Sequence, residues 1–415
     1  MHTFLLQRTQ RTALACAAAL LAHTAAQAAD SIQLKFDTIS GPNIVGLSTV
    51  EDHRGAINTH SFQFGVGVGI SPGVGGVPRQ ASQPSVSEIV TTQTFDSSYN
   101  ALNAALVSGG RYNATTSFLG GGARAPGSYL TMATGTTAIS GLSVSSGGER
   151  PSVSVSQAFR SFNLAYDPAV LGAPPGPKLE VGYDSVRGVA SGVTSRTLGA
   201  GGGGGAPGGL YLRLGAGADS IYGDSGDLGY ENWIKLSSFQ MGIGLGLAPN
   251  GADFTASRPS VSELTVTQVF DGAVPAILGN LLRGRSIGQA TLELVQMSGA
   301  RSVTTMQLEL DNVLFSGLSM SSGGDMPQVS ESLNFSGYTQ TIWDLNADGS
   351  RGDPSIFSFD IERNMVRSMA QPAASVAGFG PGQLVPMAPV PEPHTWALMA
   401  GGAAMLAMLR RRRQA

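Results

Sequence analysis

The chain has 415 residues, of which 42% are hydrophobic and 13% are charged, and its formal net charge is -3. This length allows two or three domains with their own cores, and the 57 glycines are typical of a sheet protein with many turns. The low charge provides neither the basic surface that nucleic acid requires nor a long acidic tail. We therefore expect no nucleic-acid partner.

The first residues have the pattern of a secretory signal peptide. Two arginines precede an apolar stretch at 13–21, and the small residues Ala26 and Ala28 suit a cleavage site, which we place after Ala28. The only cysteine, Cys16, lies in this segment, so the mature chain is expected to have no thiol or disulfide. A lipoprotein site at Cys16 fits poorly, because Ala13 stands where such a site prefers leucine.

A 16-residue stretch occurs twice in the chain. Residues 81–96 read ASQPSVSEIVTTQTFD and residues 256–271 read ASRPSVSELTVTQVFD, with 11 of 16 positions identical. The valine, isoleucine and threonine content predicts a strand in each copy. Each copy ends in aspartate, a good helix N-cap, and apolar residues follow at helical spacing. We therefore predict short helices that start at Asp96 and Asp271 and end at the next glycines.

Further motifs recur at offsets of 175 to 177 residues. Strands at 61–70 and 238–247 alternate apolar residues with glycine, serine or glutamine, and such glycines suggest bending or the close approach of another backbone. SGLSVSSGGERP at 140–151 and SGLSMSSGGDMP at 316–327 predict hairpins at their Ser-Gly-Gly turns. One ancestral domain was therefore duplicated as a whole.

The order of these motifs resembles the Hcp family, the haemolysin-coregulated tube proteins of type VI secretion. The loop GDSGDLGYENWIKLSSFQMGIG at 223–244 is the best single match, and the resemblance covers nearly all of both repeats. It implies a mainly β fold of two tandem two-sheet β-barrels, each with one short α-helix, from a family that assembles into six-membered rings. The first repeat departs at 41–58, where GPNIVGLSTVEDHRGAIN replaces the usual acidic loop.

The C-terminus resembles a PEP-CTERM sorting signal, which in its family is recognised by a membrane exosortase. Its parts are Pro391, Glu392 and Pro393, an apolar run at 396–409, and Arg410, Arg411, Arg412 and Arg413. As a helix this run would extend about 21 Å, against about 30 Å for a bilayer core, which suits transient membrane insertion before cleavage. The alternative is an ordinary C-terminal anchor with local thinning of the bilayer.

These observations divide the chain into six parts. They are a signal peptide at 1–28, a first Hcp-like barrel at 29–188, a glycine-rich linker at 189–209, a second barrel at 210–368, a flexible linker at 369–389 and the sorting signal at 390–415. A flexible linker of this length spans about 25 Å, enough to join adjacent domains of a ring. We predict a ring of three chains, the alternative being two independent barrels on a linker.

One loop has the spacing of a calcium site. The D-x-N-x-D-G pattern and the residues after it give a predicted ligand set of Asp344, Asn346, Asp348, Ser350 and Asp353. The twelfth position holds Ser355 instead of glutamate, so Asp353 would have to supply the bidentate ligand. The alternative is a polar turn without a metal. No other cofactor is expected.

Catalytic residues are sparse. After signal cleavage only three histidines remain, one of them in the sorting signal, and the repeated carboxylates Glu88 and Glu263 lie in separate repeats. We therefore predict no enzyme activity. The targeting segments favour an exported structural or interaction protein of the cell surface or an exopolysaccharide matrix, processed by an exosortase-type enzyme. The first alternative is a type VI secretion tube component, and the second is a surface enzyme.

Overall fold

The computed structural model describes residues 31–73, 78–120, 127–148, 150–173, 176–197, 204–250, 253–299 and 301–371. The predicted signal peptide and sorting signal lie outside these residues. Both repeats belong to one compact unit that extends to Ala370. Within the described ranges, no helix is long and apolar enough to cross a membrane.

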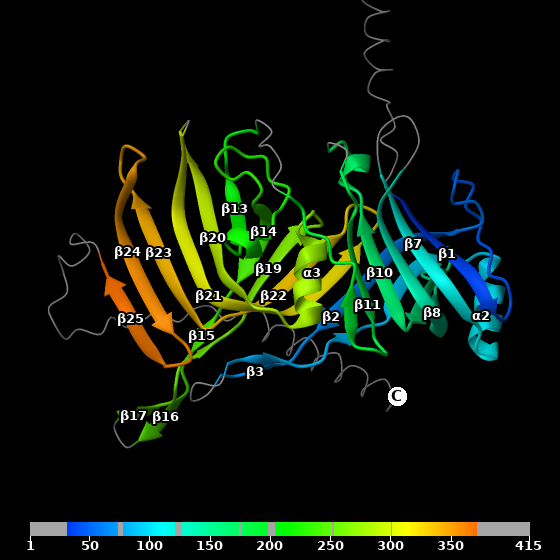
Figure 1. Ribbon diagram of the computed structural model, residues 1–415, viewed down its shortest axis with the longest axis horizontal. Coiled ribbons are helices and arrows are strands. Elements are labelled where there is room, and N and C mark those ends of the chain that lie inside the picture. The colour runs from blue at the N-terminus through cyan, green and yellow to red at the C-terminus, as the bar shows by residue number, and fades with distance from the viewer. Residues whose placement is uncertain are drawn as a thin grey trace, which may run out of the picture. The chain divides into compact units, whose positions relative to one another are not determined.

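The first repeat consists of twelve strands, one α-helix and one 3₁₀ turn (Figure 1). The strands are β1 Ser31–Ser40, β2 Ile57–Gly67, β3 Ile70–Ser71, β4 Gln80–Ala81, β5 Ser85–Val86, β6 Ile89–Thr94, β7 Arg111–Gly120, β8 Gly127–Ser145, β9 Ser152–Ala158, β10 Ser161–Tyr166, β11 Leu179–Asp184 and β12 Val189–Ser191. Helix α2 spans Ser98–Ser108, and the 3₁₀ turn spans Pro168–Leu171.

The described part of the second repeat has thirteen strands around its one α-helix, and its 3₁₀ turn follows the first strand, whereas that of the first repeat follows β10. Its strands are β13 Gly209–Leu214, β14 Ile234–Gln240, β15 Ile243–Gly244, β16 Leu247–Asn250, β17 Asp253–Ala256, β18 Ser260–Val261, β19 Leu264–Val269, β20 Ile287–Ser298, β21 Arg301–Ser322, β22 Gln328–Asn334, β23 Gly337–Leu345, β24 Arg351–Asp360 and β25 Met365–Ala370. Helix α3 spans Val274–Arg283, and a 3₁₀ turn spans Gly217–Asp219.

Strand pairing confirms that the two repeats share one topology. The antiparallel pairs β1–β7, β7–β8, β8–β10 and β10–β11 of the first repeat correspond to β13–β20, β20–β21, β21–β23 and β23–β24 of the second. The duplicated strand is β6 or β19, which pairs with β9 or β22. Its side chains alternate between buried and partly buried positions, as period-two patterning predicts. The fold is therefore two tandem, mainly β domains with one short α-helix each.

Both helices begin later than the sequence predicts. Helix α2 starts at Ser98 and α3 at Val274, and neither N-cap residue makes a side-chain cap. The aspartates instead stabilise the preceding turn, since Asp96 Oδ1 accepts from the Ser98 amide at 2.8 Å and Asp271 Oδ1 accepts from the Ala273 amide at 2.9 Å. Each aspartate therefore bonds to the turn before the helix and does not act as the helix N-cap.

Both helices end at the glycines that the sequence indicates. Gly109 and Gly284 have φ values of 65° and 59°, the left-handed conformation that closes a helix, and their amides donate to carbonyls of the last turn. Helix α2 has only Ser98, Leu102 and Ala105 buried, whereas most residues of α3 are buried. The two helices therefore differ in surroundings more than in structure.

The segment between the repeats is partly ordered. Residues 189–191, within the predicted flexible linker, form β12 and pair with β11. Beyond β12, the Thr194 amide donates to the Glu180 carbonyl at 2.9 Å. The glycine run at 198–203 lies outside the described residues. The first part of the connection therefore extends the sheet of the first repeat.

Candidate functional site: an edge-strand junction between the repeats

The two repeats are joined by direct pairing of their edge strands. Strand β2 of the first repeat runs antiparallel to the end of β21 of the second, from Phe62 opposite Ser322 to Gly67 opposite Gly317. The Val68 amide extends the ladder by donating to the Ser316 carbonyl at 2.8 Å. Nineteen of the described strands, from both repeats, consequently form one sheet, and the other six form three two-stranded sheets.

Apolar side chains fill one face of this junction. Val66 lies opposite Leu318 and Phe64 opposite Met320, and all four side chains are buried. On the glycine face, a Cβ on Gly65 would lie 3.6 Å from the Leu318 carbonyl oxygen and 3.6 Å from Ser87 Oγ, which is ordinary van der Waals contact. Edge pairing in the plane of the sheet thus brings the backbone of β21 close to β2, and its Leu318 and Ser316 carbonyl oxygens lie nearest to the glycine positions 65 and 67.

An arginine from the first repeat crosses to the second. The Arg79 guanidinium donates to the Asn334 side chain and to the Asn312 carbonyl, and its Nε lies 3.5 Å from Glu362 Oε1. The Arg79 side chain is only 5% exposed. Burial lowers the pKa of Arg79, and the nearby Glu362 charge opposes that effect. The guanidinium therefore acts as a buried, charge-assisted clamp between the repeats.

Helix α3 lies in contact with both repeats. It packs against β21 of its own repeat and against β10, β11 and β12 of the first repeat. The contacts are close: a Cβ on Gly279 would lie 2.5 Å from Val193 Cγ1, and one on Gly284 would lie 2.9 Å from Ala81 Cβ. Small residues on α3 thus allow the first repeat to dock against it.

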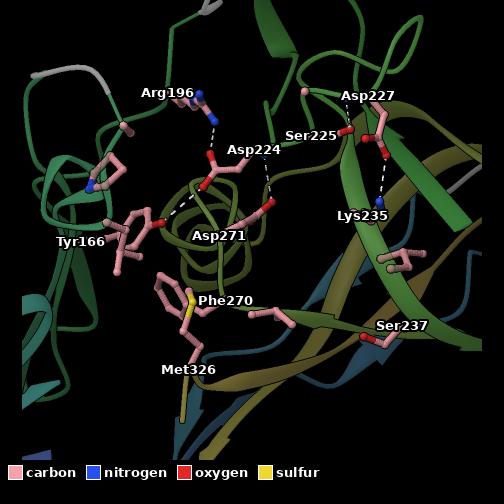
Figure 2. Close-up of a pocket in the computed structure, with 16 residues that line it drawn as sticks. Tyr166, Arg196, Asp224, Ser225, Asp227, Lys235, Ser237, Phe270, Asp271 and Met326 are labelled. Carbon is pink, nitrogen blue, oxygen red and sulfur yellow. Dashed lines mark hydrogen bonds and ion pairs between the residues drawn. The ribbon is translucent and has the colours of Figure 1, made fainter. Parts of the chain in front are cut away.

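A pocket of about 650 Å³ lies beside the start of α3. Figure 2 shows Tyr166, Arg196 and Asp224 converging there with Asp271. The Asp224 carboxylate accepts from the Arg196 guanidinium, from the Tyr166 hydroxyl at 3.3 Å and from the Gly272 amide at 3.1 Å. Groups from the first repeat, the connection and the second repeat therefore meet at one carboxylate.

Paired charges and a buried carboxylate line the pocket. None of its described lining residues is histidine or cysteine, and both basic side chains are paired, Arg196 with Asp224 and Lys235 with Asp227. Burial raises the pKa of Asp271 to about 7, and hydrogen bonding to the Ala273 amide and the Arg196 charge oppose this effect. The network links the connection to both repeats.

A second buried acid lies in the core of the second repeat. Glu331 on β22 is fully buried, and its Oε1 accepts from Gln268 Nε2 at 2.9 Å, while Oε2 has no hydrogen-bond partner among the described residues. Burial, reinforced by the Asp271 charge, raises the pKa of Glu331 to about 8. The first repeat has Val155 at this position, so the substitution is particular to the second copy.

In each repeat, the edge that corresponds to one side of the internal junction has no strand partner among the described residues. In the second repeat this edge is formed by β14 and β15, the counterparts of β2, and in the first it is residues 140–145 of β8, the counterpart of the paired end of β21. Ile243 is 57% exposed, whereas its counterpart Val66 is 5% exposed. The two free edges therefore correspond to the two sides of the internal junction, and they could pair with each other in the same way.

The predicted calcium ligands lie around the turn between β23 and β24: Asp344, Asn346, Asp348, Ser350 and Asp353. Asn346 Nδ2 donates to Ser350 Oγ at 3.0 Å, and Asp348 Oδ1 accepts from the Ser350 amide at 2.9 Å. The Ser350 hydroxyl also donates to Asp348 Oδ1, at 2.6 Å, and this bond, together with that from the Ser350 amide, lowers the pKa of Asp348. Within the described residues no group of three or more histidine, cysteine or acidic side chains is arranged to hold a metal ion, and calcium binding stays a prediction.

Sequence reasoning missed the residues that join the repeats. The Arg79 clamp, the Asp224 network and the β2–β21 pairing connect positions far apart in the chain. The available signal is the set of positions where the aligned repeats differ, such as Arg79 and Phe254. The predicted cleavage residues Ala26 and Ala28 and the sorting residues 391–393 and 410–413 lie outside the described residues.

Comparison with known proteins agrees with the duplicated fold. A family model described as "Type VI secretion system effector, Hcp" matches residues 34–166 and again 211–342. No curated protein has a significant match. Similar solved structures include a type six secretion system protein (18% identity, TM-score 0.36, 39% of this chain and 100% of that one) and Hcp1 from Salmonella typhimurium (20% identity, TM-score 0.31, 38% and 99%).

A third similar structure is the secreted protein Hcp3 from Pseudomonas aeruginosa, with 15% identity, a TM-score of 0.27 and coverage of 36% of this chain and 98% of that one. The family model matches each repeat separately and together covers more than half of the chain. The chain therefore belongs to the Hcp family of type VI secretion proteins, of which it contains two tandem domains.

Proposed function

We propose that this protein is a non-enzymatic structural subunit that assembles head to tail through its edge strands, as a component of a type VI secretion tube or a related ring. The observation that carries the proposal is the junction between the repeats, in which β2 pairs with β21. The chain thus contains one copy of the contact that it would make with its neighbours. Family membership favours the tube role over the surface-matrix role that the targeting segments indicate.

The internal junction defines the register of the proposed contact. Val66 lies opposite Leu318, and the counterparts of these residues are Ile243 and Leu142, at offsets of 177 and 176 residues. We therefore place Ile243 of one chain opposite Leu142 of the next. By the same rule Met241 lies opposite Val144, so apolar side chains occupy the same face as in the internal junction.

A contact of this type is heterologous, so it closes into a ring or continues as an open filament. The resemblance to a family that forms six-membered rings favours closure, and two domains in each chain then require three chains. Covalent linkage of the domains raises their effective concentration, which strengthens each ring with no new contact. The second candidate is an exported surface or exopolysaccharide-matrix protein, supported by the signal peptide and exosortase-type sorting signal of the sequence.

Disulfide trapping tests the register directly. The full chain with Cys16→Ser, Leu142→Cys and Ile243→Cys provides one cysteine on each edge. Directly opposed residues of antiparallel strands have Cα separations of about 4.5–5.5 Å, within disulfide range. We expect reducible cross-linking that ends at three chains.

The controls separate the possible outcomes. Each single cysteine variant lacks one partner, and a pair displaced by two residues, Val144→Cys with Ile243→Cys, should cross-link less. A ladder beyond three chains would support the edge contact but contradict ring closure. Chains that stay monomeric under oxidation, at concentrations well above those of the cell, would contradict the proposed function.

A further inference from the structure

The internal junction and the proposed junction between chains have the same strand pairing. They differ in the side chain that reaches from one repeat to the other. In the first repeat β3 and β4 pair with Ile70 opposite Ala81, and in the second β16 and β17 pair with Leu247 opposite Ala256. Two residues before each alanine stand Arg79 and Phe254. The register of the hairpins therefore makes Phe254 the structural counterpart of the arginine clamp.

The partners of the clamp also differ between the repeats. Arg79 contacts Asn312, Asn334 and Glu362 of the second repeat. The counterparts of these residues in the first repeat, at an offset of 176, are Thr136, Ala158 and Val186. The correspondence is structural as well, because Asn312 and Thr136 have the unusual φ values of 52° and 51°.

The change from Arg79 to Phe254 is matched by a change from polar to apolar side chains in the repeat that receives it. Where the second repeat presents an amide and a carboxylate to the arginine, the first repeat presents the apolar side chains Ala158 and Val186. Val186 is exposed, and so is Phe254, with 61% of its surface accessible. The side chain that would reach across the junction and the side chains that would receive it have thus changed together.

A cavity lies at the receiving position. It has a volume of about 140 Å³ and an aromatic part formed by Phe159, Phe162 and Tyr183 of the first repeat, beside Ala158. Its polar part includes Glu88, Arg160 and three serines. In the second repeat the corresponding Asn334 is in contact with the arginine. An aromatic ring suits a recess with three aromatic walls, because stacked or edge-on ring contacts add to the burial of apolar surface.

We propose that Phe254 inserts into this cavity on the first repeat of a second copy of this chain, and that the Arg79 and Phe254 pair determines the order of domains in the assembly. The inference rests on the proposed function and adds the side chain that selects the partner. The second repeat of one chain then docks only on the first repeat of the next.

The two wrong orders are both unfavourable. A first repeat docked on another first repeat would bury Arg79 against Ala158 and Val186, which offer no side-chain acceptor, and an uncompensated buried charge weakens association strongly. A second repeat docked on another second repeat would cover Glu362 and Asn334 with Phe254. Asn334 Oδ1 and Glu362 Oε1 would then lack the guanidinium that they contact in the internal junction, although Asn334 Nδ2 keeps its bond to Glu263. Specificity therefore comes from penalties as well as from attraction.

A transplanted clamp tests the inference in the full chain. Phe254→Arg should weaken association by about 10-fold or more, because a guanidinium cannot make the aromatic contacts with Phe159, Phe162 and Tyr183, and it meets the like charge of Arg160 as well as the carboxylate of Glu88. Adding Ala158→Asn and Val186→Glu to Phe254→Arg rebuilds the polar clamp between chains and should restore association. Mass by light scattering across a concentration series measures both effects.

Controls keep the test decisive. Met297→Arg adds the same charge to an exposed position near the β20–β21 turn, where pairing is internal to the second repeat, and should leave association unchanged. Thermal unfolding of each variant separates loss of assembly from loss of folding. If the wild type assembles and Phe254→Arg assembles equally well, or if the triple variant is not restored although it folds, the inference is wrong. A wild type that never assembles overturns the proposed function and this inference together.

Discussion

Helices α2 and α3 occupy the same place in two copies of one domain, yet their surfaces differ. Leu282 on α3 is 4% exposed, whereas its counterpart Val107 on α2 is 83% exposed. The difference arises because the first repeat packs against α3, while no described segment packs in the same way against α2. Burial in this protein is therefore determined by the neighbouring domain as well as by the domain's own fold.

The equivalent edge strands of the two repeats also differ in burial. Apolar side chains of β2 are buried by β21, whereas Ile243 and Leu245 at the equivalent edge of the second repeat are exposed. Exposed apolar edge strands favour association, and proteins that remain monomeric usually protect them. The second repeat lacks such protection within the described residues. One repeat has its edge buried within the chain and the other has the equivalent edge exposed. A subunit with one internal junction and one junction to a neighbouring chain requires this difference.

The largest predicted effect comes from placing a charge at each of the two junctions. Val66→Lys should destabilise the folded chain by about 3 kcal/mol or more, because the ammonium enters a buried, apolar position. Ile243→Lys should leave the thermal stability of the monomer unchanged and abolish assembly. Chemical denaturation and light scattering of both variants check this contrast. If Ile243→Lys destabilises the monomer as much as Val66→Lys does, Ile243 is buried within the monomer, and β14–β15 is not a free edge for assembly.

Several features of the fold can be predicted from the sequence alone. The duplication, the strand patterning, the glycine helix ends and the family resemblance are readable because they depend on local residue pattern. The β2–β21 junction is not readable, because a strand's own sequence does not say which distant edge it meets. The aspartates before α2 and α3 were read as N-caps, but each carboxylate bonds the turn that precedes the helix.

Composition was also an incomplete guide to the connection. Glycines at 198–205 suggested a flexible linker, yet Val189–Ser191 forms β12 and Arg196 pairs with Asp224. The buried Glu331 could be noticed only by aligning the repeats, since its neighbours alternate as in any strand. Differences between the copies, more than their similarities, therefore mark the residues with special roles.

A smaller effect should arise from Glu331, where the first repeat has valine. Burial raises the pKa of Glu331 to about 8 in the folded chain, against an ordinary value of 4.5. Between these pH values the folded state binds more protons than the unfolded state, so stability falls as pH rises through this window.

Glu331→Gln should remove this dependence. The variant keeps an acceptor for Gln268 and carries no charge, so we expect it to match the wild type near pH 4 and to be more stable by about 2 kcal/mol near pH 8. Denaturation curves at several pH values measure the difference. Parallel pH profiles for the two proteins would show that Glu331 does not cause the effect.

The smallest expected effect concerns the calcium loop, which occurs in the second repeat alone. If Asp344, Asn346, Asp348, Ser350 and Asp353 bind calcium, millimolar calcium should stabilise the folded chain by about 1 kcal/mol through mass action. Replacing Asp344 and Asp348 by alanine should abolish the increase in melting temperature. Identical melting curves with calcium and with chelator would leave the polar turn as the correct interpretation.

The most direct test of the central claim is the mass of the wild-type protein in solution, measured by light scattering over a wide concentration range. The complementary edges of β8 and β14–β15 predict a species of three chains that appears as concentration rises. A mass that stays at one chain up to the highest concentration would contradict the account.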